Sequence, residues 1–394
     1  MADIVCNQVV ITGLEAFLDL REQGFRDVIG GTLFEEDDGA LSYRFGHSLI
    51  SDYCEDDWVG IHDHVIYSRD GGKIWSAPQL VTLPRVKNLK RESFGFGPFF
   101  RTRAGTVLYT GIHQVLDGEE GTRHRDMSMR DYMTLYARRE KGASALDIVE
   151  WPPGVFMGEK FLEGGLQLPS GRLLFTMWGL DKRGENWRSG VLLSDDEGKT
   201  WRFVAVAYEP DLAIRDNPTQ PAGFNEQTLF HTQDNRIISI VRGREGLGRG
   251  VPGGGKQDTW FFRAESSDEG ETWSAPEPTN LPGTGATFGM GLVLPDGSLL
   301  IGCRLPYSRT YYDLPEKELF GLNLARSFDQ GRTWKPEHLV QRDHEGHAFN
   351  THHCAMNGRF VQTGVRAFEY LFGFFGHGYE PKLQRVLRLK LRID

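Results

Sequence analysis

The most regular feature of the sequence is a short unit in which an apolar stretch, a turn of Asp, Asn or Gly residues and a second apolar stretch follow one another. Such a unit predicts a β-hairpin, because these turn residues favour tight connections between strands. Its six copies are GTLFEEDDGALSYRF, GPFFRTRAGTVLYTG, GLQLPSGRLLFTMW, EQTLFHTQDNRIISIVR, MGLVLPDGSLLIGCR and HCAMNGRFVQTGVR. The turn residues are Gly39, Gly105, Gly171, Asn235, Gly297 and Gly358. They follow at intervals of 66, 66, 64, 62 and 61 residues, and this spacing indicates a repeat architecture.

A second repeated pattern, S-x-D-x-G-x-x-W, occurs four times after these hairpins. Its copies are Ser68–Trp75, Ser194–Trp201, Ser266–Trp273 and Ser327–Trp334, and they start 126, 72 and 61 residues apart. The Asp carboxylate can bind the backbone N–H groups of a tight turn, and Gly accepts a conformation that other residues avoid. The pattern matches the Asp-box, which we interpret as structural, and Ala137–Gly142 has the place of a degenerate copy. Together the repeats predict an all-β fold, a six-bladed β-propeller with four-stranded antiparallel blades, as one domain over residues 1–394.

Composition and charge limit the classes of function that we expect for this protein. The net charge of −9 argues against a nucleic-acid partner. No apolar run is long enough to span a bilayer, the N-terminus lacks the features of a signal peptide, and the four cysteines are far apart. We therefore expect a cytoplasmic protein with reduced thiols, no membrane partner, no metal and no cofactor. The oligomeric state stays open.

The repeat itself nominates site residues, because equivalent positions in the blades converge on one end of a propeller. Seven or eight residues after each turn residue stand His47, His113, Trp178, Arg242, Arg304 and Arg366. Arginines that converge on one axis repel each other unless an anion lies between them, so we expect an anionic carbohydrate ligand. Glu226 is the acidic exception among the strand starts and is a candidate for catalysis. Asp57, in the acidic loop before Ser68, is a second candidate.

These residues resemble the sialidase superfamily of glycoside hydrolases. The resemblance implies a Tyr nucleophile paired with a Glu, an Asp acid/base and three Arg that hold the substrate carboxylate. Glu226 and Arg242 match the Glu and the second Arg in spacing, and Asp57, eleven residues before Ser68, matches the acid/base. The sequence departs from the pattern elsewhere: Phe349 stands at the nucleophile position, and the first and third Arg have no counterpart in register.

Three functions follow from this pattern. The first is a glycoside hydrolase of carbohydrate metabolism that cleaves a terminal acidic sugar, sialic-acid-like or uronic, with Asp57 and Glu226 as its carboxylates. The second is a polysaccharide lyase that acts on a uronate, for which His47, His113, His352 and His353 are candidate bases. The third is a carbohydrate-binding propeller without catalysis, which fits the absence of the expected Tyr.

Overall fold

The structure is a computed structural model of the chain. It describes residues 8–19, 28–48, 61–81, 91–115, 132–149, 157–180, 186–207, 222–243, 260–282, 291–304, 321–342, 354–362, 367–376 and 385–394. Every regular element in these ranges is a β-strand, so the prediction of an all-β fold is confirmed. No helix in the same ranges is long and apolar enough to cross a membrane.

The strands form antiparallel meanders in which each strand pairs with the next along the chain. The first sheet contains β2 (Val28–Glu35), β3 (Leu41–Ser48), β4 (Ile61–Ser68) and β5 (Gln79–Leu80). The second contains β6 (Arg91–Arg101), β7 (Val107–Val115), β8 (Tyr132–Arg139) and β9 (Asp147–Val149). A further sheet contains β18 (Gly291–Val293), β19 (Leu299–Arg304), β20 (Gly321–Ser327) and β21 (Lys335–Arg342).

Two meanders between these sheets are joined into one sheet of eight strands. One consists of β10 (Met157–Gln167), β11 (Leu173–Leu180), β12 (Asn186–Ser194) and β13 (Arg202–Ala207), and the other of β14 (Ala222–His231), β15 (Ile237–Gly243), β16 (Trp260–Ser266) and β17 (Glu277–Pro282). The junction is a parallel pairing of β12 with β14 over two residues on each strand. Strand pairing alone therefore gives five sheets among the described residues, four of four strands and one of eight.

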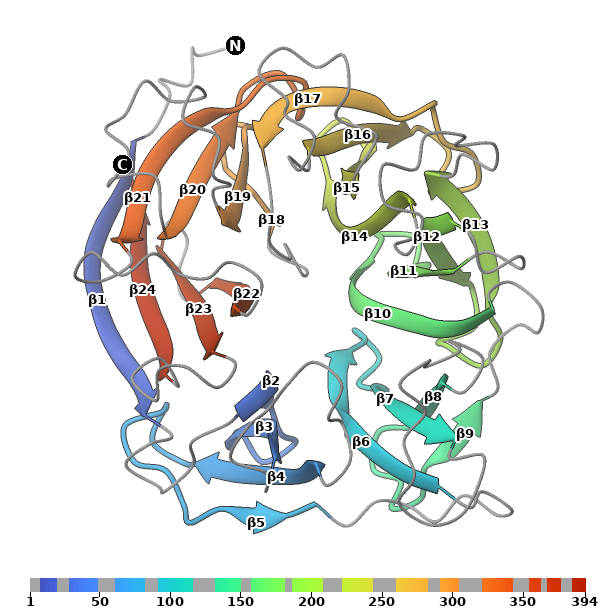
Figure 1. The fold of residues 1–394 in the computed structure, drawn as a ribbon, viewed down its shortest axis with the longest axis vertical. Coiled ribbons are helices and arrows are strands. Elements are labelled where there is room, and N and C mark those ends of the chain that lie inside the picture. The colour runs from blue at the N-terminus through green and yellow to red at the C-terminus, as the bar shows by residue number, and fades with distance from the viewer. Residues whose placement is uncertain are drawn as a thin grey trace.

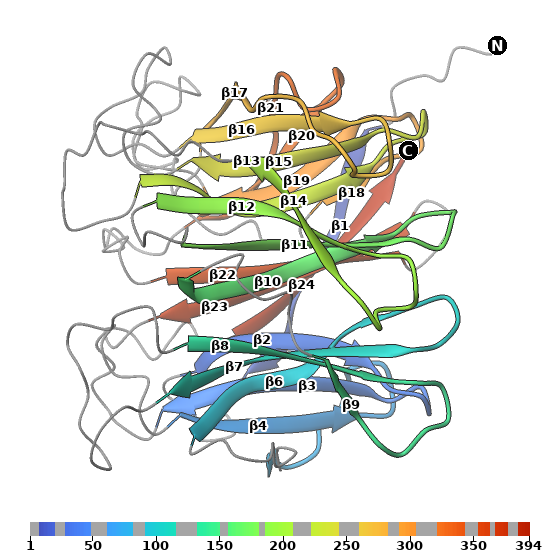
Figure 2. The ribbon, with the colours of Figure 1, turned by 90° about the vertical axis from the view of Figure 1, so that its right-hand side faces the viewer.

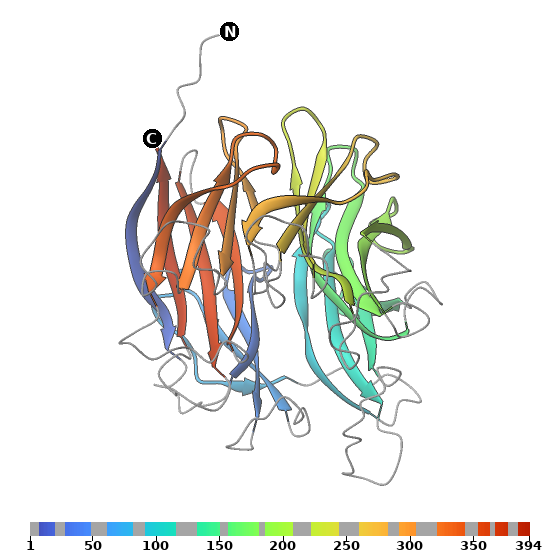
Figure 3. The same cartoon turned by 45° about the horizontal axis from the view of Figure 1, so that its top comes forward.

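The last sheet unites the two ends of the chain. It contains β22 (Cys354–Gln362), β23 (Ala367–Gly376), β24 (Arg385–Ile393) and, as its outer strand, β1 (Val9–Asp19). Figure 3 shows β1, in blue, beside β24, in red. The sheets surround a common centre, with β2, β6, β10, β14, β18 and β22 innermost (Figure 1). The side view shows the strands running across the ring from one end to the other (Figure 2).

The apolar core lies between neighbouring sheets. Side chains of β14–β17 and of β18–β21 make one cluster, which includes Phe230, Phe261, Ile301 and Trp334. The middle strands therefore have both faces covered: in β15 six of seven residues are buried. In the outer strand β13, in contrast, only the last two residues are buried.

Five predicted turns and all four S-x-D-x-G-x-x-W motifs lie where the sequence places them. Gly39, Gly105, Gly171, Asn235 and Gly297 have φ between 60° and 103°, and each lies between the first and second strands of its meander. Each motif begins at the last residue of a third strand, and we call these four segments the box turns. In every box turn the Ser hydroxyl donates to the Asp carboxylate at 2.7–2.8 Å and accepts the Gly N–H at 2.8–2.9 Å.

The degenerate copy keeps part of this geometry. Arg138 replaces the Ser and Glu140 the Asp, and the two side chains are paired at 3.1 Å. Gly142, at the place of the motif glycine, has φ of +79°.

The sixth predicted turn is wrong. Gly358 lies inside β22 and is paired with Phe372 of β23. The turn signal of Asn357-Gly358 is local, whereas nine successive cross-strand pairs, from Cys354–Gly376 to Gln362–Phe368, continue through it. Because Gly358 is not a turn residue, Arg366, which was counted from it, loses its basis in the repeat.

Candidate functional site

Glu226 and Arg242 meet on neighbouring strands at a β-bulge. Phe224 pairs with Gly243 and Gln227 with Val241, so that two residues of β14, Asn225 and Glu226, face Arg242 alone. A bulge adds one residue to a strand and redirects its side chains, and bulges are frequent next to active sites. The inner strands β2, β6 and β10 have register shifts at comparable places. In β10 the extra residue is Glu163, which lies between the paired residues Leu162 and Gly164.

The two side chains form a largely buried ion pair. Arg242 Nη1 donates to Glu226 Oε2 at 2.5 Å, and the side chains are 12% and 10% exposed. Removing two charges from water costs several kcal/mol per ion, roughly, so such a pair is a weak stabiliser of a fold. Burial alone does not separate function from structure, since Arg326 and Asp296 form an even less exposed pair. What favours a functional role for Glu226 and Arg242 is their place on a bulge, at the end of β15 where the other predicted site positions lie in their own sheets.

The strand around Glu226 is unusually polar for an inner strand. Asn225, Glu226, Gln227 and Thr228 are all buried. Gln227 Nε2 donates to the carbonyl of Gly190 on β12, and Gln227 Oε1 accepts the Ser239 hydroxyl of β15 at 2.9 Å. The sequence analysis missed Gln227 because it selected residues by counting from the turns. The signal for it was present, since a run of four polar residues, NEQT, interrupts an otherwise apolar strand.

Trp178 and Trp187 line the adjoining part of the neighbouring meander. Their rings pack edge to face with centroids 4.9 Å apart, and both side chains are buried. Gly223 of β14 pairs with Trp187 in parallel. Gly223 has φ of +115°, and a Cβ atom there would lie 2.3 Å from the Trp187 carbonyl oxygen. Only glycine therefore permits this approach of the two strands.

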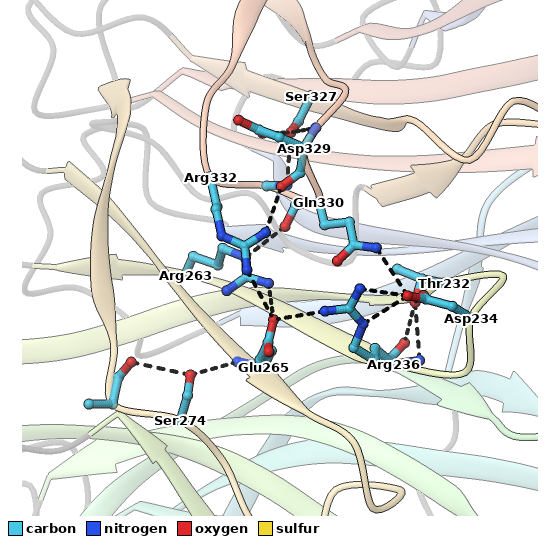
Figure 4. A network of polar contacts seen from close by, with 12 residues as sticks. Thr232, Asp234, Arg236, Arg263, Glu265, Ser274, Ser327, Asp329, Gln330 and Arg332 are labelled. Carbon is cyan, nitrogen blue, oxygen red and sulfur yellow. Dashed lines mark hydrogen bonds and ion pairs between the residues drawn. The ribbon is translucent and has the colours of Figure 1, made fainter.

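A second polar cluster lies at the opposite end of the same sheets (Figure 4). Glu265 forms ion pairs with Arg263, with Arg236 at 3.6 Å and with Arg332 at 3.8 Å. Hydrogen bonds from Thr232 and then Arg236 hold the pKa of Asp234 well below its usual range. The Gln330 carbonyl accepts Arg263 Nε at 2.7 Å. Because these groups pair among themselves and connect two box turns, we interpret this cluster as structural.

Comparison with known families agrees with the repeats. The family model for the BNR repeat-like domain matches residues 55–370. The chain belongs to the BNR repeat-like domain family. No curated protein matches the sequence significantly.

Several solved structures have a fold similar to that of this chain. A protein of unknown function from Dyadobacter fermentans is 16% identical, with a TM-score of 0.66 over 98% of this chain and 99% of that one. A Hadza microbial sialidase is 13% identical, with a TM-score of 0.60 over 96% of this chain and 68% of the other. An α-L-arabinofuranosidase of glycoside hydrolase family 93 from Fusarium graminearum is 13% identical, with a TM-score of 0.56 over 98% of both chains. These likenesses establish a sialidase-like fold.

In this BNR family member, five of the predicted positions share one location in their sheets. His47, His113, Trp178, Arg242 and Arg304 each lie within the last three residues of a second strand. In the backbone register His47 is opposite His62, His113 opposite Ser93, and Arg304 opposite Leu322. Asp57 and Arg366 lie outside the described residues, so the structure brings together only Glu226 and Arg242 of the predicted pairs. The roles of the others stay predictions.

Proposed function

We propose that this protein is a glycoside hydrolase that removes a terminal acidic sugar, sialic-acid-like or uronic, from a carbohydrate. The observation that carries the proposal is the buried Glu226–Arg242 pair on the bulge of β14. We further propose that the six meanders are the six blades of one β-propeller, with β10–β13 and β14–β17 as two blades that share a short parallel junction. The site then lies at the end of the ring where the second strands end.

The proposed reaction uses two carboxyl groups as acid and base, and arginines that bind the sugar carboxylate. Asp57 protonates the leaving glycosidic oxygen, while Glu226 takes a proton from the attacking water, directly or through an intervening hydroxyl. The bond between the anomeric carbon and the glycosidic oxygen breaks; the leaving group keeps that oxygen with the proton from Asp57, and the sugar receives the hydroxyl group of the water. Loss of a proton from Glu226 to solvent and uptake of one by Asp57 restore the two carboxyl groups. Arg242 and Arg304 bind the sugar carboxylate. A guanidinium has five N–H donors, so Arg242 can hold Glu226 and a substrate carboxylate together. In this proposal His47, His113 and Trp178, from the neighbouring blades, also contact the substrate.

Support for hydrolysis comes from the fold neighbours as well as from the residues. The neighbours include a sialidase and an arabinofuranosidase, two glycoside hydrolases that differ in the sugar they release. The sialidase-like scaffold therefore carries glycoside hydrolysis with different sugar pockets. The acidic sugar is favoured here because Arg242 and Arg304 occupy the same place in two sheets.

The test is a screen of the purified protein on sialyl, ketodeoxy, uronyl and arabinofuranosyl glycosides, with products identified by mass and ultraviolet absorbance. Glu226→Gln and Asp57→Asn run beside wild type, and Glu163→Gln is included because Glu163 is the extra residue of the neighbouring bulge. Asp296→Asn is the matched control, since Asp296 is paired with Arg326 at 2.5 Å and both side chains are buried, far from β14 in the chain. We expect hydrolysis by wild type and Asp296→Asn and a loss of at least about 1,000-fold in Glu226→Gln and Asp57→Asn.

Other outcomes would replace the proposal. A product that lacks water and absorbs as an unsaturated uronate would move the chemistry to a lyase and to the histidines. Binding of an oligosaccharide without turnover would make the protein a carbohydrate-binding propeller. Release of arabinose alone would keep the hydrolase and reject the acidic sugar.

A further inference from the structure

The β14 segment that carries Glu226 is fastened on both sides of its bulge. On one side, Ala222 and Gly223 pair with Asn186 and Trp187 of β12 in parallel. On the other side, Gln227 reaches the carbonyl of Gly190, further along the same strand β12. The bulge of β14 is therefore enclosed between two attachments to one neighbouring strand.

Gln227 also connects the bulge to the strand that carries Arg242. Its Oε1 atom accepts the hydroxyl of Ser239, which lies three residues before Arg242 on β15. Gln227 has no exposed surface and Ser239 none either. Hydrogen bonds in such a dry environment are strong, and a satisfied buried network makes the local geometry rigid.

A bulge needs such support more than a regular strand does. The extra residue is left out of the ladder, so the backbone at Asn225 and Glu226 is fixed by fewer inter-strand hydrogen bonds than its neighbours. A misplacement of about 1 Å in a reacting group can cost a factor of about 100 in rate. The position of the Glu226 carboxylate thus depends on what holds Gln227.

We propose that Gln227 is a positioning residue of the site, which fixes the bulge and thereby aligns the Glu226 carboxylate with the Arg242 guanidinium. This inference rests on the proposed glycosidase function. A merely structural role, as a link between the two meanders, would give the same contacts but a different response to substitution.

The chain offers a matched control for the structural role. Gln233 also connects two sheets through its side-chain amide, and its Nε2 donates to the Pro295 carbonyl at 3.0 Å. Gln233 lies in the turn after β14, at the end of the strand away from Glu226. Gln227→Met and Gln233→Met therefore remove the same chemical group, in one case within β14 beside the bulge and in the other in the turn that follows β14.

The experiment compares these variants by kinetics on the substrate found in the screen, by melting temperature and by amide hydrogen exchange of residues 222–231. We expect Gln227→Met to lower kcat by about 10- to 100-fold with KM changed less than about 3-fold, because the substrate still binds but the reacting group is displaced. Its kcat–pH profile shifts, and exchange at residues 225–228 becomes faster. Gln233→Met keeps wild-type kcat, pH profile and exchange at the bulge. Ser239→Ala, which removes one hydrogen bond and little volume, gives a smaller loss of kcat.

Each outcome decides the inference. Wild-type kcat in Gln227→Met, or equal losses in Gln227→Met and Gln233→Met, would overturn it. Should Gln227→Met fail to fold, Ser239→Ala carries the test, and wild-type kinetics in that variant would count against positioning. Absence of turnover in wild type would refute the proposed function separately, while unchanged exchange at residues 225–228 in Gln227→Met would refute the fixation of the bulge itself.

Discussion

The two ends of the β14–β15 hairpin hold their polar groups in opposite ways. At the end with the turn, the Ser, Asp and Gly of each box turn bind one another within a few residues in sequence, and this arrangement is repeated in four meanders. Further contacts there, such as that of Arg263 with the Gln330 carbonyl, connect one turn to the next. At the other end, Glu226, Arg242 and Gln227 bind across strands and across meanders. Arg242 lies five residues beyond Ile237, the first residue of β15, which is about 17 Å along an extended strand.

This difference indicates that the turn end of each hairpin serves stability and the opposite end serves function. In the box turns the polar groups are hydrogen-bonded to one another, so these turns stabilise the sheets whether or not a ligand is bound. The buried Glu226–Arg242 pair costs desolvation and contributes little to folding. Its place at the end of β15, where the other predicted site positions lie in their own sheets, favours a functional role. Variants at the turn end should change stability and leave catalysis intact, whereas removal of both charges of the Glu226–Arg242 pair should abolish catalysis and leave stability at or above the wild-type value.

The largest expected effect on stability is at Trp334. Its side chain is 2% exposed, packs between two sheets and donates its Nε1–H to the Gly331 carbonyl at 3.0 Å. Trp334→Ala removes this contact area and leaves a cavity, so we expect the free energy of unfolding to fall by about 3–5 kcal/mol. Urea denaturation followed by circular dichroism measures it. Trp273→Ala, at the partly exposed equivalent position, should lose less. A reduced kcat in the folded Trp334→Ala protein would contradict the view that the turn end serves stability alone.

The next effect tests the ion pair itself. Arg242→Met leaves the Glu226 carboxylate buried without its cation, and we expect a loss of about 3 kcal/mol in the free energy of unfolding. The double variant Glu226→Met/Arg242→Met removes both charges and should recover wild-type stability or exceed it, without activity. The exposed pair Arg202–Glu271, with side chains 44% and 40% exposed, provides the control: Arg202→Met should cost less than about 1 kcal/mol. If the double variant is as unstable as Arg242→Met, the site end also stabilises the fold and the comparison fails.

A smaller effect is expected within one box turn. Asp329 accepts the Ser327 hydroxyl at 2.8 Å and the Thr333 backbone N–H at 2.8 Å. Asp329→Ala removes a carboxylate that binds backbone N–H groups, as at a helix N-cap, and should cost about 1–2 kcal/mol. Glu140, at the same position of the degenerate copy, is 56% exposed, and Glu140→Ala should change stability by less than about 0.5 kcal/mol. Equal losses in thermal or urea unfolding would show that the degenerate copy still works as a full turn.

The same contrast explains what the sequence could predict. The box turns and five of the six hairpin turns were predictable because the groups that determine them are within about eight residues of one another. The sixth turn was misplaced because the Asn357-Gly358 signal is equally local, while the pairing of β22 with β23 decides the register. A local pattern therefore succeeds only where tertiary pairing does not compete with it.

Site prediction was limited by contacts between distant residues. Glu226 and Arg242 were predictable as a pair because they are sixteen residues apart on one hairpin. The contact of Gln227 with Gly190 spans thirty-seven residues and two meanders, and no spacing in the sequence indicates it. In β10 likewise, Leu162 is opposite Met177 and Gly164 opposite Thr176, so Glu163 is an extra residue that changes the count between turn and site.

The smallest effect concerns pH and belongs to the turn end. For Asp196 and Asp329, burial raises the pKa, but hydrogen bonds from the following Thr and from the motif Ser lower it by more, so the net pKa is below the usual value of 3.8. A carboxyl group whose pKa is lowered in the folded state stabilises the protein above its unfolded pKa of about 3.9, and this contribution is lost as the pH falls through the folded pKa. The urea midpoint should therefore fall from about pH 4 downward, and the fall should be shallower in Asp196→Asn/Asp329→Asn than in wild type.

The control is Arg202→Met, which leaves both carboxyl groups in place and should follow the wild-type curve. Parallel acid curves for wild type and the double variant would mean that these carboxyl groups titrate alike in the folded and unfolded chain, and the box turns would then owe their stability to the Trp contacts alone.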